Sequence, residues 1–263
     1  MRKLILTASI MAMAAAAPAH AENLEIKAET LGVKVENAID KTAAKIETKY
    51  NQMKVAVLDH KGGEAKFIET NLNPEHTATG LIGKTITNAN GERIGTLEDI
   101  IVDGNGVAKT AIVADGDFAG IGKKAAFDYS SVINTNKKGD IVASISEQDI
   151  KSAKKFSYDA KDSANGSTVI PAGSYSVKEL LDADVKTSSN NLDLDVENLT
   201  FNGNKAEYFV VEADKDKTNK DSYAAIAFSD VKMLSTDDEN EFDVQLSATT
   251  EQSLLAHIST AAQ

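Results

Sequence analysis

The residues that could perform chemistry are few and scattered along this sequence of 263 residues. The four histidines, His20, His60, His76 and His257, have no carboxylate or second histidine at the spacing of a metal site, so we expect solvated loop or helix residues. The absence of cysteine excludes disulfides, thiolate metal ligands and a cysteine nucleophile. There is also no G-x-S-x-G motif for a serine nucleophile. We therefore expect no enzymatic activity, no metal site and no cofactor.

Two short motifs resemble ligand loops but fail on their spacing. Residues 214–218 begin like a calcium-binding loop, but Asn219 stands where the glycine is needed and Ala225 where the bidentate glutamate is needed. The glycines between Gly116 and Gly122 have neither the spacing nor the following long helix of a phosphate-binding loop. Both segments are predicted to be loops between strands.

The charge of the protein is acidic and concentrated. The chain has 28 Lys and Arg against 40 Asp and Glu, a formal net charge of -12, which argues against a nucleic-acid partner. The densest acidic run provides the candidate docking residues Asp237, Asp238, Glu239, Glu241 and Asp243. Two interpretations remain open: a solubilising face with weakly bound counterions, or a docking face for a basic partner or divalent cations.

The first 21 residues are predicted to be a cleavable signal peptide. Arg2 and Lys3 precede an apolar run over residues 4–17, and Ala19-His20-Ala21 forms an A-x-A cleavage site. This apolar run and all later ones are shorter than a membrane-spanning helix requires, so no transmembrane segment is expected. The pattern predicts export to the periplasm.

Residues 22–54 are predicted to form an amphipathic helix. They contain no proline, and apolar residues recur at steps of three and four. The candidate contact stripe consists of Leu24, Leu31, Val35, Ile39, Ile46 and Tyr50. This stripe could pack on the rest of the protein or self-associate as a coiled coil. A membrane-surface role is less favoured, because the polar face has mixed charge and there is no Trp.

The remainder of the chain reads as two strand-rich segments separated by loops. We expect a connector over 55–78 with one possible strand from Val55 to Leu58, and then a first domain over 79–153. A linker over 154–173, a second domain over 174–256 and a tail over 257–263 are expected to follow. In the first domain, Asn88-Ala89-Asn90-Gly91 and Asp103-Gly104-Asn105-Gly106 are turn sequences between strands. A capped short helix is expected to begin at Ser146.

The two strand-rich segments share sequence features at nearly constant spacing. Glu98-Asp99-Ile100 is matched 99 positions later by Glu197-Asn198-Leu199, and Ala126-Phe127 is matched 101 positions later. Lys84-Thr85 is matched by Lys186-Thr187 at 102. Offsets that change only within turns indicate a duplicated domain.

The first segment resembles a known family. Leu81-Ile82-Gly83-Lys84, Asn90-Gly91-Glu92-Arg93-Ile94-Gly95, Leu97 to Asp103 and Ile121-Gly122-Lys123-Lys124 are similar to the running pattern of PRC-barrel domains. The resemblance covers residues 79–153 and extends more weakly to 174–256. It implies a small antiparallel β-barrel used for protein–protein contact and assembly rather than catalysis.

The predicted architecture is therefore mainly β: two small antiparallel PRC-like β-barrels in tandem, preceded by an amphipathic N-terminal α-helix. The predicted function is that of an exported, non-catalytic interaction or assembly module of the bacterial envelope, with an unidentified protein partner. The alternative is a periplasmic protein that binds a small molecule or a cation, in a stress-related role.

Overall fold

The computed structural model describes residues 54–59, 66–115, 122–135, 139–187, 194–213, 222–235 and 242–261. The predicted signal peptide and the predicted helix contact stripe from Leu24 to Tyr50 lie outside these residues. None of the helices in the described part of the chain is long and apolar enough to cross a membrane.

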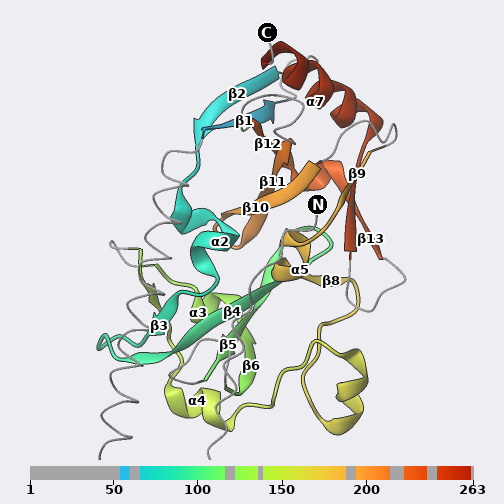
Figure 1. Cartoon of the computed structure of the whole chain (residues 1–263). Coiled ribbons are helices and arrows are strands. Elements are labelled where there is room, and N and C mark those ends of the chain that lie inside the picture. Colours follow the sequence, from blue (N-terminus) through green and yellow to red (C-terminus); the bar gives the residue numbers. More distant parts are fainter. Residues whose placement is uncertain are drawn as a thin grey trace, which may run out of the picture. The chain divides into compact units, whose positions relative to one another are not determined.

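The chain begins its described part with a hairpin and then forms two similar series of elements (Figure 1). The hairpin consists of β1 (Lys54–Asp59) and β2 (Lys66–Asn71). The first series, which we call the first half (residues 73–153), consists of η1 (Pro74–His76), α2 (Ala78–Leu81), β3 (Thr85–Thr87), β4 (Arg93–Asp103), β5 (Ala108–Ala114), β6 (Lys124–Asp128), α3 (Tyr129–Val132), β7 (Ile141–Val142) and α4 (Glu147–Ser152).

The second half (residues 174–261) follows a linker that contains the 3-10 helix η2 (Ala160–Asn165). It consists of β8 (Ser174–Ser176), α5 (Val177–Leu181), β9 (Val185–Lys186), β10 (Leu194–Asn202), β11 (Lys205–Ala213), β12 (Ser222–Ala227), η3 (Phe228–Asp230), β13 (Val231–Ser235), β14 (Phe242–Leu246) and α7 (Ala248–Ala261). The order short helix, short strand, long hairpin, third strand, helical turn and final helix is thus common to both halves.

The strands pair into three sheets. The first half forms a sheet in the order β6-β5-β4-β3-β7, to which β8 of the second half adds by pairing with β4. The second half contributes β10-β11-β12 to a sheet that continues with β1 and β2, and its remaining strands form the sheet β13-β14-β9.

The two long hairpins carry their irregularities at equivalent positions. The β4–β5 pairing shifts register between Leu97 and Asp99, and the β10–β11 pairing shifts between Val196 and Asn198, 99 positions later. The parallel short strands also pair in a similar way, Ile86 with Ile141 and Val185 with Val244, at offsets of 99 and 103.

The mainly β character and the local turns are confirmed. Gly91 and Gly106 have φ of 81° and 79°, which glycine adopts without the steric cost that a Cβ adds. α4 begins with a capping box, in which the Ser146 side chain accepts the Asp149 backbone N–H and the Asp149 side chain accepts the Ser146 N–H.

The prediction of two antiparallel barrels is confirmed only in part. Among the described residues the strands form three mixed sheets, and neither half closes into a barrel. In the second half, β1 pairs in parallel with β12. It therefore occupies the edge of β12 to which another strand of this half would have to pair to close a barrel. In the first half, the linker borders β6, where the Phe156 N–H donates to the Lys124 carbonyl at 2.7 Å.

Two domain boundaries also differ from the prediction. The predicted connector over 55–78 contains both strands of the β1–β2 hairpin and the helical elements η1 and the start of α2. The tail predicted for 257–263 continues α7 as far as Ala261. The apolar run from Val55 to Leu58 indicates a possible strand in the connector, where the structure has β1, and His257 is expected in a C-terminal helix, where the structure has α7.

One apolar core runs through both halves. Its buried members come from β4 and β5 of the first half and from β10, β11 and β14 of the second, and include Leu97, Ile100, Leu199 and Phe209. Because the halves share a core, contacts between them lie in the interior rather than only at a surface seam.

Candidate functional site

The carboxylate of Asp99 on β4 is fully buried and accepts four hydrogen bonds. Its Oδ1 accepts the backbone N–H of Ile100 at 2.7 Å and that of Lys178 at 3.1 Å. Its Oδ2 accepts the hydroxyls of Ser176 at 2.6 Å and Tyr158 at 3.1 Å. Three of these four donors come from the linker or the second half, so Asp99 ties the first half to both of those segments.

Asn198 on β10 occupies the equivalent position in the second half and is also fully buried. Its Oδ1 accepts the backbone N–H of Leu199 at 2.9 Å and that of Thr79 at 3.2 Å. Its Nδ2 donates to the Thr79 hydroxyl at 2.6 Å. The buried polar residue of each long strand therefore binds the short helix of the other half, α2 or α5.

The two helices begin in the same way. The hydroxyl of Thr77 accepts the Gly80 N–H at 3.2 Å at the start of α2, and that of Ser176 accepts the Glu179 N–H at 3.2 Å at the start of α5. Thr77 and Ser176 also lie against the opposite half's long strand, as antiparallel pairs with Thr200 and Ile101 respectively. We call these two arrangements the Asp99 junction and the Asn198 junction.

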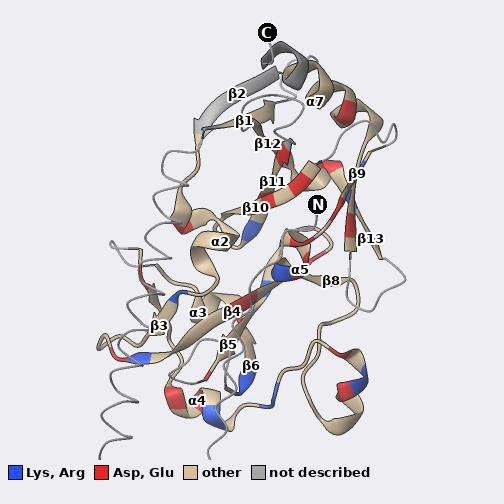
Figure 2. Cartoon of the chain, viewed as in Figure 1, with Lys and Arg blue, Asp and Glu red and all other residues tan. Residues whose placement is uncertain are grey.

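Charged side chains surround the Asp99 junction. Glu98 accepts a hydrogen bond from Lys124 at 2.8 Å and from Lys178 at 3.0 Å. Figure 2 shows this acidic segment of β4 beside basic segments of α5 and β6. Burial acts to raise the pKa of Glu98, but the two lysines outweigh it and hold the pKa below the ordinary value. Lys124 also lies 5.3 Å from the centre of the Tyr158 ring.

The acids within the junction are shifted in the other direction. Burial raises the pKa of Asp99, although its four donors oppose the shift. Burial, followed by the charge of Asp99, raises the pKa of Glu179 to about 7. Burial and the same carboxylates raise the pKa of Tyr158. Because the donors Tyr158, Ser176 and Lys178 lie in the linker and the second half, the arrangement joins segments of the protein.

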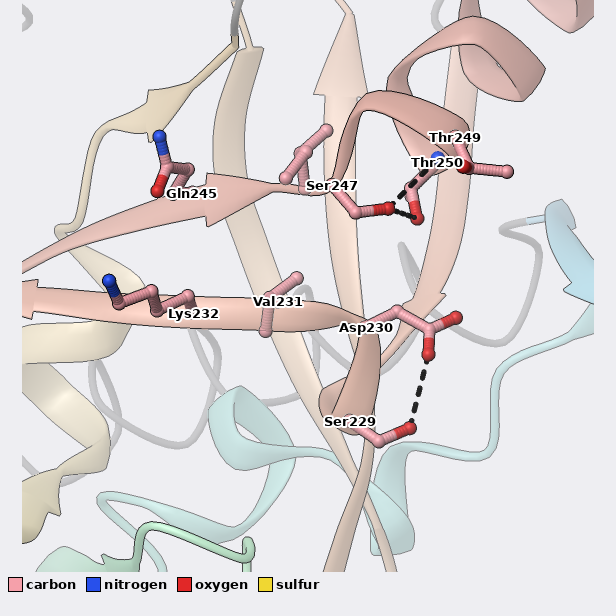
Figure 3. A pocket seen from close by; sticks show the side chains of 9 residues that line it. Ser229, Asp230, Val231, Lys232, Gln245, Ser247, Thr249 and Thr250 are labelled. Atoms are coloured by element: carbon pink, nitrogen blue, oxygen red, sulfur yellow. Dashed lines mark hydrogen bonds between the residues drawn. The ribbon is translucent and has the colours of Figure 1, made fainter.

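A second feature is an open groove of about 700 Å³ on the second half. Lys232 of β13 and Gln245 of β14 are paired neighbours and lie side by side along it (Figure 3). At the start of α7, Ser247 Oγ lies 2.8 Å from Thr250 Oγ1 and accepts the Thr250 N–H at 3.1 Å. The rest of the lining consists of Ser229, Asp230, Val231, Leu246 and Thr249. Seven of the nine lining residues have polar side chains.

The residues selected from the sequence are placed as follows. Asp243 lies on β14 with Oδ1 3.6 Å from Lys186 Nζ, while Asp237, Asp238, Glu239 and Glu241 lie outside the described residues. Lys186 also pairs with Asp184 at 2.9 Å. The whole predicted helix stripe lies outside the described residues too. Within the described ranges, no group of three or more His, Asp or Glu is arranged to hold a metal ion.

The fold of the first half agrees with a comparison against protein families. The PRC-barrel domain family matches this stretch of the chain. Residues 73–149 are a PRC-barrel domain. The PRC-barrel domain therefore starts at η1, six residues before the predicted boundary at 79, and ends within α4. The same family comparison does not detect a second copy. A search of curated proteins finds no match.

Asp99 and Asn198 are not among the site residues predicted from the sequence, although both lie in segments that match between the two halves. A signal was present: each is a polar residue followed by apolar residues inside a long strand, where an unpaired side chain is costly. Their partners lie 79 and 119 residues away along the chain, so nothing local could identify them.

Proposed function

We propose that this protein is an exported, non-catalytic binding and assembly module of the bacterial envelope, and that the groove along β13 and β14 receives an extended segment of a protein partner. The observation that carries the proposal is the groove itself, which is open and lined in part by the paired strands β13 and β14. The signal-peptide pattern over residues 1–21 supports export.

The strand beside the groove supports an extended occupant. β13 is the outermost strand of its sheet, and its only partner among the described strands is β14. An outer strand presents backbone N–H and C=O groups, to which an extended peptide can add as a further strand. The exposed Lys232 and Gln245 would then contact the side chains of that peptide.

The charge of the neighbouring chain favours a basic partner. The connection between β13 and β14 contains Asp237, Asp238, Glu239 and Glu241 of the acidic run, and Asp243 lies on β14. A segment with Lys or Arg would be attracted to this edge, and the attraction would weaken as ionic strength rises. The amphipathic stripe over 22–54 would provide a second contact, for self-association.

We also propose that the second half is a diverged second PRC-like copy, too altered for family comparison to detect. Its support is the shared order of elements, the equivalent register shifts and the reciprocal junctions. A duplication gives both halves one scaffold, while a groove beside β13 and β14 would let the second copy specialise in binding.

Site-specific photo-crosslinking in cells tests the binding function. A photoreactive residue at position 232 or 245 is expected to capture the same protein, whereas one at Gln148, exposed on α4, is expected to capture none. With the captured protein purified, affinity should fall as salt is raised from about 50 to 200 mM.

Equal capture from all three positions, or affinity that is independent of salt, would contradict the proposal. Titration calorimetry with Ca²⁺ provides the comparison with the alternative function. Stoichiometric Ca²⁺ binding by the full chain, lost when Asp243 is replaced by Asn, would favour cation binding instead.

A further inference from the structure

The two junctions share one backbone plan but differ in charge. Asp99 on β4 corresponds to Asn198 on β10, and the helix positions Lys178 and Glu179 correspond to Thr79 and Gly80, all at an offset of 99. The Asn198 junction is therefore built from neutral groups. The Asp99 junction contains two carboxylates near the start of α5, that of Asp99 from β4 and that of Glu179 from α5 itself.

Glu179 is the residue of the Asp99 junction whose side chain has an unsatisfied hydrogen-bond acceptor among the described residues. Its Oε2 is buried and accepts no hydrogen bond from the described residues. Its backbone N–H is already used by Ser176. When Glu179 is ionised, this buried oxygen lacks a hydrogen-bond donor and the side chain faces the negative charge of Asp99, whereas a protonated side chain avoids the repulsion.

We propose that the Asp99 junction is a pH-sensitive joint between the two halves, which tightens when Glu179 takes up a proton and loosens when Glu179 is ionised beside Asp99, while the Asn198 junction holds at both pH values. The proposal rests on the geometry at the start of α5, where Glu179 directly follows Lys178, the residue whose N–H donates to Asp99.

The charges around Glu179 agree with this assignment. Burial and the charge of Asp99 raise its pKa to about 7, against the opposing charge of Lys178 on the same helix. Glu98 is occupied by Lys124 and Lys178. The remaining titratable groups on the elements packed against α5 are Arg93 and Asp103 on β4, Asp195 and Glu197 on β10, Asp243 on β14 and Tyr175 on β8. From the linker, Tyr158 donates to Asp99.

The direction of the effect follows from the pKa. The closed junction holds the Glu179 proton up to about pH 7, whereas an opened junction releases it near the ordinary value of 4.5. Opening therefore becomes easier as pH rises from about 4.5 to 7, and changes no further above 7. Because Glu179 is only partly buried, we expect about a tenfold change in the opening equilibrium rather than the full effect of the shift.

Amide hydrogen exchange on the full chain tests the joint with an internal control. The Lys178 N–H donates to Asp99 and the Thr79 N–H donates to Asn198, at 3.1 and 3.2 Å. The protection factor of Lys178, corrected for intrinsic exchange, is expected to fall about tenfold relative to that of Thr79 between pH 5 and pH 8. A ratio that stays constant over this range would overturn the proposal.

A variant links the effect to Glu179. Glu179→Gln replaces the carboxyl by a neutral amide, so the Lys178 to Thr79 ratio should no longer change between pH 5 and pH 8. Glu207→Gln, at an exposed position of β11, removes the same charge elsewhere and should leave the wild-type pH dependence in place. If Glu179→Gln retains the pH dependence, another group is responsible and the assignment is wrong.

Discussion

Asp99 and Asn198 are 99 positions apart and each accepts the second helical N–H of the other half, from Lys178 at 3.1 Å and from Thr79 at 3.2 Å. These hydrogen bonds accompany the packing of α5 of the second half against β4, and of α2 of the first half against β10. The first N–H groups of a helix have no intrahelical partner, and here a buried side chain accepts one of them. Such an acceptor stabilises the fold, because its loss would leave several buried donors unpaired.

Removing either acceptor should destabilise the whole protein. Asp99→Ala leaves four donors without their acceptor, and we expect a loss of about 2–4 kcal/mol in the free energy of unfolding. Asn198→Ala should cost about 2–3 kcal/mol for the same reason. Urea denaturation of the full chain measures both. Asp195→Ala, at an exposed position of β10, is the control and should change stability by less than about 0.5 kcal/mol. Losses no larger than that of the control would show that the junctions do not carry stability.

Glu98 should make stability depend on pH in acid. Its pKa is lowered in the folded protein, so its contribution is present above the ordinary value of 4.5 and is lost as pH falls through the folded value. Glu98→Gln should therefore cost about 1–2 kcal/mol at pH 6, and the difference from wild type should shrink as pH falls below 4.5 through the lowered folded pKa.

The control for this charge is Glu147→Gln on α4. Its contact with Lys151 lies between exposed side chains, and such pairs contribute little. Denaturation profiles at pH 3.5, 5 and 6 measure both variants. A Glu98→Gln difference that persists unchanged at pH 3.5 would count against the pairing with Lys124 and Lys178.

Gly80 should be intolerant of any side chain. A Cβ at this position would lie 1.9 Å from the Pro74 carbonyl oxygen and 2.8 Å from the Thr77 hydroxyl. Gly80→Ala is therefore expected to displace η1 from α2 and to cost about 3 kcal/mol or more. Gly104→Ala meets nothing closer than 3.8 Å and should be nearly neutral. Thermal unfolding of the two variants compares them, and equal midpoints would contradict the close packing of this turn.

Much of the local structure was predictable from particular residues. The turns at Gly91 and Gly106 follow from the positive φ that glycine tolerates, and the start of α4 follows from the capping pair Ser146 and Asp149. The PRC-barrel domain was recognisable from its motifs, and family comparison confirms it over residues 73–149. These features depend on neighbours in the chain, so a linear pattern contains them.

The sheets and the junctions depended on contacts between distant segments. The segment of β1 and β2 is predicted from its sequence to be a connector with one possible strand from Val55 to Leu58. Its composition does not reveal that Ala56 and Val57 pair in parallel with the edge of β12. That edge cannot also close a barrel, which is why the tandem-barrel expectation was only partly confirmed.

The sequence by itself determined the motifs of the PRC-barrel domain, the turns at Gly91 and Gly106 and the helix cap at Ser146, since each rests on residues close together in the chain. Only the tertiary structure decided that Asp99 and Asn198 each bind the short helix of the other half. A buried polar side chain must find partners wherever packing places donors, and here packing places them in the other half of the molecule.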